Sequence, residues 1–380
     1  MWSEKLIKSD GNAAHTNAEI FHQPKLWKKI WKKIYDNKDE IKEFVNSGIE
    51  QSDNIVLTGA GTSAYIGIAV QRSFRNKFNK IAEPISTTHI VSHPTDFFLK
   101  NQNLFLVSFA RSGNSPESSA VVKLADNHTK NCKHLIITCN PEGDLAKNHK
   151  ENGYVFTLPP EANDKSLAMT SSYSGMMIAG ILISRIDEIE ALESEVDKLV
   201  TYGNNALSQA EYIYSISAQP FTRAIFLGSG ALYGVAKEAQ LKMQELTDGM
   251  VICKHDSFLG LRHGPKAVID ENTLVVYHLS NNPYASRYEL DLLQTMKDNS
   301  CPMGQLAIGE HIGEIENMDW KIELDCELSH TIDKDLLSVA SILPAQLLAM
   351  YKSIHLGLKP DNPSRNGAIS RVVQGVNIYN

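Results

Sequence analysis

The chain has 380 residues, with 37 lysines and arginines against 44 aspartates and glutamates, a formal net charge of −7. This balance argues against a nucleic-acid-binding protein, because phosphate backbones attract basic surfaces, but it still allows a local pocket for a small anion. Hydrophobic residues make up 42% of the chain, and the most apolar short stretch, Met176 to Ile183, is far too short to span a bilayer. Composition therefore predicts a soluble globular protein whose partners include neither nucleic acid nor membrane.

The cysteines predict a cytoplasmic location. They are odd in number, widely spaced and form no C-x-x-C pair, so we expect reduced thiols at Cys132, Cys139, Cys253, Cys301 and Cys326. The first 23 residues carry acids and lack the charged-then-apolar pattern of a secretory leader.

An amphipathic helix is predicted over residues 24–45, "PKLWKKIWKKIYDNKDEIKEFV". Trp27, Ile30, Trp31 and Ile34 recur at helical spacing, with lysines between them. A membrane-surface helix would show the same pattern. We favour a helix that packs its tryptophans on the protein body or on a second subunit.

From residue 53 onward, short β-branched runs alternate with helical patterns, which is typical of a parallel sheet wrapped by helices. The expected strands are "NIVLTG", "NLFLVSF", "HLIITC" and "GYVFTLP". The segment 170–217 has helical spacing, with predicted breaks near Ile186 and Gly203.

The layout then starts again, because "RAIFLGSGALYGVAKEAQLKMQEL" repeats the order strand, G-x-G turn and helix of "NIVLTGAGTSAYIGIAVQRSF". Later strands are "TLVVYHL", "QLAIG" and "WKIEL", and Pro344 predicts a kink or a junction in the last helix. The expected fold class is α/β, with two tandem three-layer αβα modules that each hold a mainly parallel sheet flanked by helices. The expected domains are an N-terminal helical segment 1–45, a first module 46–203 with phosphate-binding loops, a second module 204–360 with a catalytic helix and a histidine loop, and a C-terminal tail 361–380.

The first turn, Gly59 to Ala64, has the G-x-G-x-x-A form of a dinucleotide-binding turn, and Glu83 lies at a suitable distance to meet a ribose. A nucleotide-dependent oxidoreductase is therefore one alternative. The second copy has Tyr233 where that motif requires a small residue. Two tight strand-to-helix turns without a nucleotide explain both copies equally well.

The stretch "SFARSGNSPES", residues 108–118, follows an apolar run and predicts a phosphate cradle. The hydroxyls of Ser112 and Ser115 and the backbone amides around Gly113 and Asn114 can converge on one phosphoryl group. The first turn, at a neighbouring strand end, can add further hydroxyls. A polar loop with helix-capping serines is the alternative.

The helix "VAKEAQLKMQEL" places Glu238, Lys242 and Glu245 on one face. Such spacing also occurs in weak surface ion pairs, but the apolar neighbours leave this helix little polar surface, and buried carboxylates beside a lysine are acid–base candidates. His263 lies in the stiff loop "GLRHGPKAVID", where it is either preorganised for catalysis or structural. No helix carries H-E-x-x-H, so we expect no metal site.

Seven motifs in order resemble the sugar isomerase (SIS) superfamily with two tandem SIS modules: "TGAGTSAYIG", "SFARSGNSPES", "AMTSSYS", "FLGSGALYG", "LKMQELTDG", "RHGPKAVID" and "SRVVQGV". Within it the match is to the AgaS group of tagatose-6-phosphate ketose/aldose isomerases, and it extends over nearly the whole chain. The resemblance implies a sugar-phosphate substrate, and in that group the deamination of D-galactosamine 6-phosphate to D-tagatose 6-phosphate and ammonia.

The resemblance also assigns roles by comparison with the isomerase half of glucosamine-6-phosphate synthase. It implies a proton-shuttling Glu245 with Lys242 before it, and a ring-opening His263 that is supplied by a neighbouring subunit. Glu238 is a further candidate for proton transfer to the leaving nitrogen. The implied substrate- and phosphate-binding residues are Gly61, Thr62, Ser63, Arg111, Ser112, Gly113, Asn114, Ser115 and Thr170.

One departure concerns the tail, where the synthase has a lysine and this chain has Ile369, with Arg371 nearby. A guanidinium forms no imine, so no tail Schiff base is expected. The implied enzyme needs no cofactor or metal and forms a homodimer or a higher homo-oligomer. The alternatives are an aldose–ketose isomerase of a neutral hexose phosphate such as tagatose 6-phosphate, a glucosamine-6-phosphate deaminase and a non-catalytic sugar-phosphate sensor.

Overall fold

The computed structural model describes residues 12–148, 153–299, 301–316, 318–325, 331–373 and 375–379. Residues 1–11 and Cys326, on which sequence predictions were made, lie outside the described residues. The chain forms two compact units: unit A comprises the described residues of Lys25–Asn163, Ser171–Val196 and Ser370–Asn380, and unit B those of Met1–Pro24, Asp164–Thr170 and Asp197–Ile369. The module boundaries expected from the sequence stay a prediction.

Unit A contains a five-stranded sheet in which every pair of neighbours is parallel. In the order β2-β1-β3-β4-β5, its strands are β2 (Ala82–Pro84), β1 (Asn54–Thr58), β3 (Asn103–Ala110), β4 (Asn131–Thr138) and β5 (Gly153–Thr157). The four strands expected from the apolar runs are confirmed, and β2 is an edge strand that the sequence did not indicate. All of β1 is buried, as expected for a parallel strand covered on both faces.

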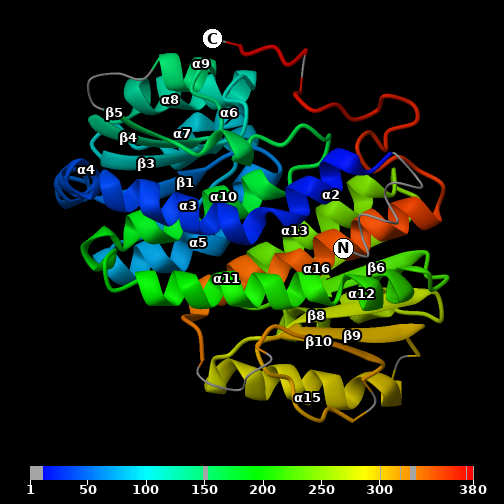
Figure 1. Ribbon diagram of the computed structural model, residues 1–380. Coiled ribbons are helices and arrows are strands. Elements are labelled where there is room, and N and C mark those ends of the chain that lie inside the picture. The colour runs from blue at the N-terminus through cyan, green and yellow to red at the C-terminus, as the bar shows by residue number, and fades with distance from the viewer. Residues whose placement is uncertain are drawn as a thin grey trace. The chain divides into compact units, whose positions relative to one another are not determined.

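Helices cover both faces of this sheet (Figure 1). Those of the first face are α6 (Thr87–Ser92), α7 (Pro94–Phe97), α8 (Pro116–His128) and α9 (Asp144–Lys147). On the other face lie α3 (Gln23–Asp36), α5 (Thr62–Phe78) and α10 (Ser171–Ser184), while α4 (Lys38–Glu50) leads into β1. Every residue of α10 is buried, so it is the central helix of this layer.

The tryptophan stripe packs on the protein body, one of the two arrangements expected. Trp27, Ile30 and Ile34 are 0% exposed and Trp31 is 4% exposed. The indole Nε1 of Trp27 donates to Ser174 Oγ at 2.9 Å, and that of Trp31 donates to the Ile189 carbonyl at 2.9 Å. The lysines between them lie on the solvent side. A membrane-surface helix needs an exposed apolar face, and the apolar face of this helix is buried, so the membrane-surface interpretation is not supported.

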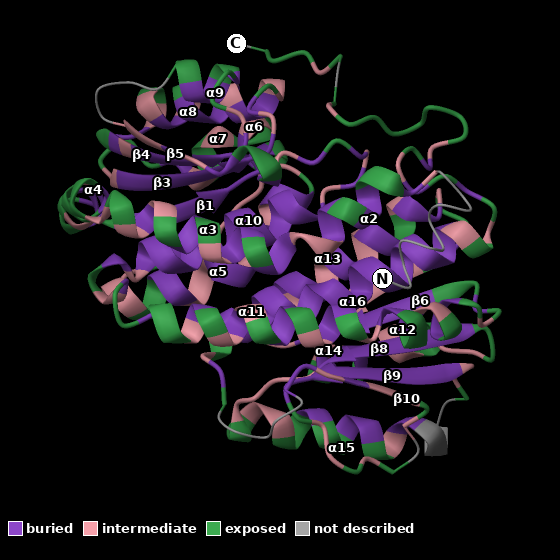
Figure 2. Cartoon of the chain, viewed as in Figure 1, coloured by how far each residue is buried: buried purple, intermediate pink, exposed green. Residues whose placement is uncertain are grey.

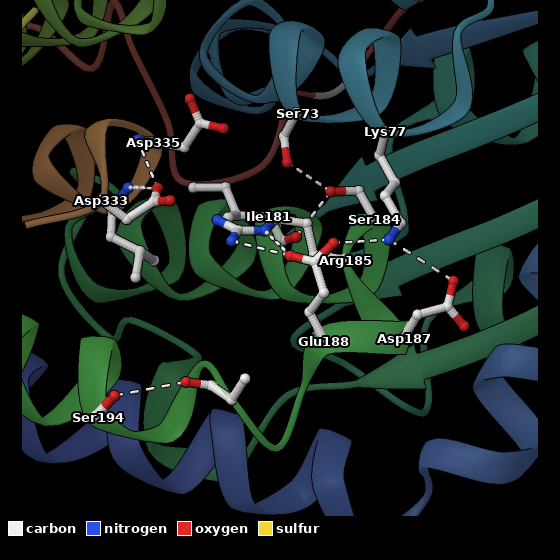
Figure 3. A network of polar contacts seen from close by, with 12 residues as sticks. Ser73, Lys77, Ile181, Ser184, Arg185, Asp187, Glu188, Ser194, Asp333 and Asp335 are labelled. Atoms are coloured by element: carbon white, nitrogen blue, oxygen red, sulfur yellow. Dashed lines mark hydrogen bonds and ion pairs between the residues drawn. The ribbon is translucent and has the colours of Figure 1, made fainter.

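A polar cluster joins the ends of α5 and α10 in unit A (Figure 3). Ser73 and Ser184 share a hydrogen bond of 2.6 Å, and the Lys77 ammonium lies 2.7 Å from Glu188 Oε1. Arg185 pairs with the same carboxylate at 3.1 Å. The hydrogen bond from Lys77 holds the pKa of Glu188 below its usual value despite partial burial. The cluster therefore satisfies the polar ends of two buried helices.

Unit B repeats the topology with the sheet order β10-β9-β8-β6-β7, again parallel throughout. Its strands are β10 (Trp320–Glu323), β9 (Gly304–Gly309), β8 (Thr273–His278), β6 (Arg223–Leu227) and β7 (Ile252–Asp256). In both sheets the first strand of the unit pairs with the second on one side and the third on the other. The turns also match, since Gly61 has φ 54° and ψ −126° and Gly230 has φ 60° and ψ −128°. The tandem α/β fold class is confirmed.

The helices of unit B are α2 (Ala14–Phe21), α12 (Ala210–Ser217), α13 (Ala231–Leu246), α14 (Phe258–Leu261), α15 (Pro283–Asn299) and α16 (Lys334–His355), and α11 (Glu193–Ser208) precedes α12. Figure 2 shows buried α16 beside strands that are buried along most of their length. Among the described residues, α16 alone is long and apolar enough to cross a membrane. Since 94% of its apolar window is buried in the structure, α16 has the character of a core helix.

The helix break predicted near Gly203 is wrong, and of the two outcomes predicted at Pro344, a kink or a junction, the junction is wrong. The break near Ile186 is confirmed, but Gly203 lies inside α11, and the chain breaks instead at Gln209. Pro344 lies within the continuous 22-residue α16 rather than at a junction of two helices. Burial explains both outcomes, because tertiary packing outweighs a propensity cost of about 1 kcal/mol for glycine and about 3 kcal/mol for proline.

We expect Trp27→Ala to lower the free energy of unfolding by about 3–5 kcal/mol, because it leaves a cavity and removes the bond to Ser174. Lys29→Ala is the matched control on the same helix, since the Lys29 side chain is 57% exposed and its ion pair with Glu161 contributes less than about 1 kcal/mol. Urea unfolding followed by circular dichroism measures both. Equal losses in the two variants would contradict the packing of α3 described here.

Candidate active site

The phosphate-loop residues lie at the switch point of the sheet in unit A. The chain leaves β1 for β2 on one side and returns to β3 on the other, so the loops after β1 and β3 are neighbours. Thr58 pairs with Ser108 in the register of the two strands. Open α/β sheets bind ligands at the carboxyl ends of strands flanking such a point. The structure therefore brings the predicted residues 61–63 and 111–115 to one edge.

The first of these loops is a tight turn from β1 into α5. A Cβ on Gly59 would lie 2.6 Å from the Cβ of Ser63, and Gly61 has the positive φ that an L side chain rarely adopts. Thr62 and Ser63 are each 4% exposed in the first turn of α5. Their hydroxyls therefore lie beside the positive end of a 17-residue helix.

The second loop has the geometry of a cradle rather than of a helix cap. Ser115 stands at the N-cap position of α8, but its hydroxyl contacts Ser118 Oγ at 2.6 Å and caps no backbone amide. The amide of Asn114 donates to Ser112 Oγ at 3.3 Å, and Gly113 has φ 66°. This arrangement leaves the amides at the start of α8 without a cap from Ser115, which favours the phosphate interpretation over capping serines.

A third loop, after β4, supports the second one. Asn140 Nδ2 donates to the Ser112 carbonyl at 2.9 Å, and the Asp144 amide donates to Asn114 Oδ1 at 2.9 Å. A Cβ on Gly143 would lie 2.3 Å from the Ser112 oxygen, so only glycine fits there. Sequence reasoning missed these residues, although "NPEGD" carries turn signals directly after a predicted strand.

Arg111 points to the tail of the chain. It is 6% exposed, and its guanidinium donates to the Arg371 carbonyl. The Arg371 guanidinium in turn donates to Asn163 Oδ1 at 3.1 Å. Arg111 thus holds the tail at Arg371 within unit A, and its contact with substrate stays a prediction.

The acid–base candidates form a compact row on α13 in unit B. Lys242 Nζ lies 2.5 Å from Glu245 Oε2 and 3.4 Å from Glu238 Oε1. Glu238 and Lys242 are fully buried. Burial alone would lower the pKa of Lys242, but the two carboxylates outweigh it and hold that pKa above its usual value. The row therefore carries a charged lysine between two glutamates.

Glu245 is the member of this row that a ligand can reach. Its side chain is 23% exposed and stands in the last turn of α13, whereas that of Glu238 is 0% exposed. The Lys242 ammonium orients the Glu245 carboxylate. An oriented, partly exposed carboxylate suits a general base that takes and returns a proton.

Thr170, the predicted sugar contact, lies in a buried network of unit B. Its hydroxyl and its amide donate to the two oxygens of Asp164 at 3.2 and 3.1 Å, and its carbonyl accepts from Gln346 Nε2 at 3.2 Å. Glu19 accepts from the Ser166 amide at 3.2 Å, and burial followed by the charge of Asp164 raises the pKa of Glu19. Sequence reasoning missed these partners: Gln346 and Glu19 are far from Thr170 and Ser166 in sequence, and Asp164, six residues from Thr170, carries no motif.

His263 lies in a loop of unit B outside α13. It is exposed between α14 and the short 3-10 helix Pro265–Val268, next to Gly264 with φ 109°. In the part of the chain that the structure describes, no hydrogen bond or ion pair joins it to Glu238, Lys242 or Glu245. The expectation that a neighbouring subunit supplies this histidine stays a prediction.

The tail passes the C-terminal end of α13. Arg365 Nε donates to Asp248 Oδ2 at 2.7 Å, and this hydrogen bond holds the pKa of Asp248 below its usual value. Ile369, at the position of the synthase lysine, is 38% exposed, and its amide donates to Ser364 Oγ at 3.3 Å.

The switch point of unit B differs from that of unit A. Asn282 Oδ1 accepts from the amides of Tyr284 and Ala285 at 2.9 and 3.2 Å, so it caps α15. The Ser280 amide donates to Glu289 Oε2 at 2.9 Å, and burial raises the pKa of Glu289 to about 7. The protein's own side chains satisfy these amides, which leaves unit A with the loop better suited to an anion.

The described residues contain no group of three or more histidine, cysteine, aspartate or glutamate side chains that could hold a metal ion. The expectation of a reaction without metal or cofactor stays a prediction. In unit A the turn after β1 retains the glycines of a nucleotide-binding turn, and Glu83 is exposed on β2.

We expect Lys242→Met to destabilise unit B by about 3–5 kcal/mol, because it leaves the buried Glu238 carboxylate without its cation. The double variant Glu238→Gln/Lys242→Met removes that unpaired charge and should recover much of the loss. Urea denaturation of both variants tests this coupling. Additive losses would show that the two side chains do not depend on one another.

Stability should also depend on pH through Glu289, whose folded pKa of about 7 exceeds the ordinary value of 4.5. A raised acid pKa means that the folded state prefers the protonated form, so stability falls as pH rises from 4.5 through 7. We expect the free energy of unfolding of Glu289→Gln to exceed that of the wild type by about 3 kcal/mol near pH 8 and to match it below about pH 4.5. Exposed Glu271→Gln is the control, and urea unfolding across this range should show no pH-dependent difference from the wild type for it.

Comparison with known proteins agrees with this arrangement. Residues 48–183 match the SIS domain. D-galactosamine-6-phosphate deaminase AgaS of Shewanella sp. (strain ANA-3) is 38% identical over 369 residues, which cover 96% of this chain and 91% of that protein. A proposed tagatose-6-phosphate ketose/aldose isomerase from Clostridium novyi NT has a TM-score of 0.94 at 38% identity, covering 98% of this chain and 96% of the other. For tagatose-6-phosphate ketose/aldose isomerase from Escherichia coli the TM-score is 0.86 at 34% identity, with 96% of each chain covered. The chain therefore belongs to the SIS-domain family and, within it, to the AgaS group with two tandem SIS modules.

Proposed function

We propose that the protein is a sugar-phosphate deaminase/isomerase that converts D-galactosamine 6-phosphate into D-tagatose 6-phosphate and ammonia. The name of the Shewanella relative supports this substrate. The observation that carries the proposal is the α13 row, in which a partly exposed Glu245 is oriented by a buried, charged Lys242. That row supplies the base that an aldose–ketose proton transfer requires.

The phosphate would bind at the switch point of unit A. Ser112 and Ser115, with the amides of Gly113 and Asn114, would hold its oxygens, and Thr62 and Ser63 would add hydroxyl donors. Support comes from the uncapped start of α8 and from the hydrogen bonds that fix the loop from Asn140 and Asp144. Thr170 would contact the sugar while Asp164 holds its hydroxyl in place.

The chemistry starts once the pyranose ring opens, with His263 assisting that step. Glu245 takes the proton from C2 of the open-chain amino aldose and returns it at C1, through an enolamine. The product carries an imine at C2, which water attacks so that ammonia leaves and the ketose phosphate remains. Lys242 stabilises the developing negative charge, and Glu238 is the candidate for proton transfer to the nitrogen. No cofactor or metal takes part.

The finer parts of this proposal concern assembly, reaction class and location. Because His263 is exposed and does not meet Glu245 within the chain, we propose a homodimer or higher homo-oligomer with a shared active site. The release of ammonia with uptake of water makes the enzyme a hydrolase. A cytoplasmic location fits the free thiols at Cys132, Cys139, Cys253 and Cys301.

A second candidate is an isomerase of neutral tagatose 6-phosphate, which the names of the two similar structures favour. This isomerase would use Glu245 in the same way on a substrate that carries no amine. A glucosamine-6-phosphate deaminase differs only at C4 of the sugar. A sensor without catalysis would have no use for the Glu–Lys–Glu row, and the oxidoreductase alternative finds no support in the names of these relatives.

We expect rapid ammonia and ketose-phosphate formation from galactosamine 6-phosphate, slower reaction of glucosamine 6-phosphate, and a loss of about 10²–10⁴-fold in kcat for Glu245→Gln. Gln244→Ala is the matched control, because Gln244 is the exposed neighbour on the same helix and should retain full activity.

Failure of both amino sugars to release ammonia, despite binding, would overturn the deaminase proposal. Interconversion of tagatose 6-phosphate and its aldose by the same protein would then identify the isomerase. Binding of these sugars without any turnover would identify the sensor.

A further inference from the structure

A pocket lies in unit A at the opposite end of the strands from the phosphate loops. It has a volume of about 470 Å³ and is lined by the first residues of β3 and β4 and the end of α8. Asn103 and Asn131 mark the strand starts, and Asp126, Lys130, Cys132 and Lys133 contribute the chemically active groups. The predicted ligand loops follow the last residues of β1 and β3, so this pocket is separate from them.

Three side chains of this region form a relay. Cys132 Sγ lies 3.8 Å from His134 Nδ1, and His134 Nε2 lies 2.9 Å from Asp126 Oδ1. Cys132 and His134 are two residues apart on β4, so their side chains share one face of the sheet. Asp126 comes from α8, which packs on that face.

The order of these contacts fixes what each group does. A carboxylate accepts hydrogen bonds, so the contact with Asp126 favours the tautomer of His134 that has its proton on Nε2 and a lone pair on Nδ1 facing the sulfur. Nδ1 can then accept the thiol proton, and Asp126 stabilises the imidazolium that forms. This arrangement activates a thiol in the same way that a base and an orienting carboxylate activate other nucleophiles.

The surroundings favour an anionic partner. Lys130 and Lys133 both line the pocket, against one aspartate that is already engaged with His134. Cys132 is among the residues that line this pocket; it is 5% exposed and belongs to the same buried cluster as Leu104 and Val121.

Cys253, in unit B, is a partly buried cysteine whose thiol has a backbone carbonyl as its hydrogen-bond partner instead of a histidine. Its thiol donates to the Val251 carbonyl at 3.3 Å, and burial raises its pKa. It therefore serves as an internal reference for an inert thiol.

We propose that Cys132 is an activated thiol that undergoes exchange with small anionic disulfides bound in this pocket. The Cys132 thiolate attacks one sulfur of the disulfide and forms a new S–S bond to it. The original S–S bond breaks, and the other half leaves as a thiol after taking the proton held by His134. Two electrons move within the disulfide exchange, so no further oxidant is needed.

The test uses the intact protein and the anionic disulfide 5,5′-dithiobis(2-nitrobenzoate), with labelling at each cysteine resolved by peptide mass spectrometry. We expect Cys132 to be labelled faster than Cys253 and at least as fast as exposed Cys301. His134→Gln should lower the Cys132 rate about tenfold and leave the Cys301 rate unchanged.

Asp126→Asn is the second variant, because Asp126 lies at the surface of α8 with 15% exposure and its replacement keeps the volume. It should also lower the Cys132 rate. Lys130→Gln/Lys133→Gln should slow the anionic reagent but not the neutral disulfide 4,4′-dithiodipyridine, which separates charge recognition from thiol activation.

Two results would overturn the proposal: Cys132 left unlabelled in the folded protein, or labelled at a rate that neither His134→Gln nor Asp126→Asn changes. Equal effects of the lysine changes on both reagents would overturn the anionic preference. The measurement needs no sugar phosphate, so its outcome is independent of the proposed deaminase activity.

Discussion

The ammonium group of Lys242, between Glu238 and Glu245, is the interaction on which the packing of α13 and the proposed chemistry of unit B depend. A fully buried glutamate beside a buried lysine is tolerated because each cancels the desolvation cost that the other would carry alone. The second glutamate, which is 23% exposed, then shares the same cation from the last turn of the helix. Lys242 thus allows Glu238 to be buried in the core and orients the carboxylate of Glu245 at the exposed end of α13. A neutral residue at position 242 would lose both.

Duplication gave two sheets with one topology, and the differences between the copies decide where a ligand can bind. Both first turns share the same positive-φ glycine, at Gly61 and Gly230, because both must pass sharply from strand to helix. The loops after the third strands differ. In unit B Asn282 caps α15, and Glu289 accepts a hydrogen bond from the Ser280 amide. In unit A Asn140 holds the loop through the Ser112 carbonyl, and Ser115 at the N-cap position makes no side-chain cap to the amides of α8.

Local pattern predicted most of this fold. Apolar runs identified nearly all of the strands, but not β2, which is three residues ending in proline, nor β7, whose "ICKHD" lacks a clean apolar pattern at the sheet edge. The residues Ser112, Ser115, Glu238, Lys242 and Glu245 could be predicted because each motif is continuous in sequence. Asp164, Gln346 and Asn140 could not, since they act through contacts made only after folding; Gln346 meets a carbonyl 176 positions away. The relay at Cys132 was missed for the same reason, because its aspartate comes from the preceding helix.

The absence of a lysine at position 369, where the chain has isoleucine, is the strongest constraint on the proposed mechanism. In the proposed mechanism Ile369 provides no tail amine that could form an imine with the sugar, so the imine that water attacks is the one at the substrate's own C2 nitrogen. An amine on C2 is then a requirement of ammonia release rather than an incidental substituent, and a neutral sugar can complete only the proton transfer. The tail keeps a structural task, since Arg365 ties it to Asp248 just after the helix that carries Glu245. In the proposed mechanism the same glutamate would therefore serve both reactions, and the substituent on C2 of the substrate would decide between isomerisation alone and loss of ammonia.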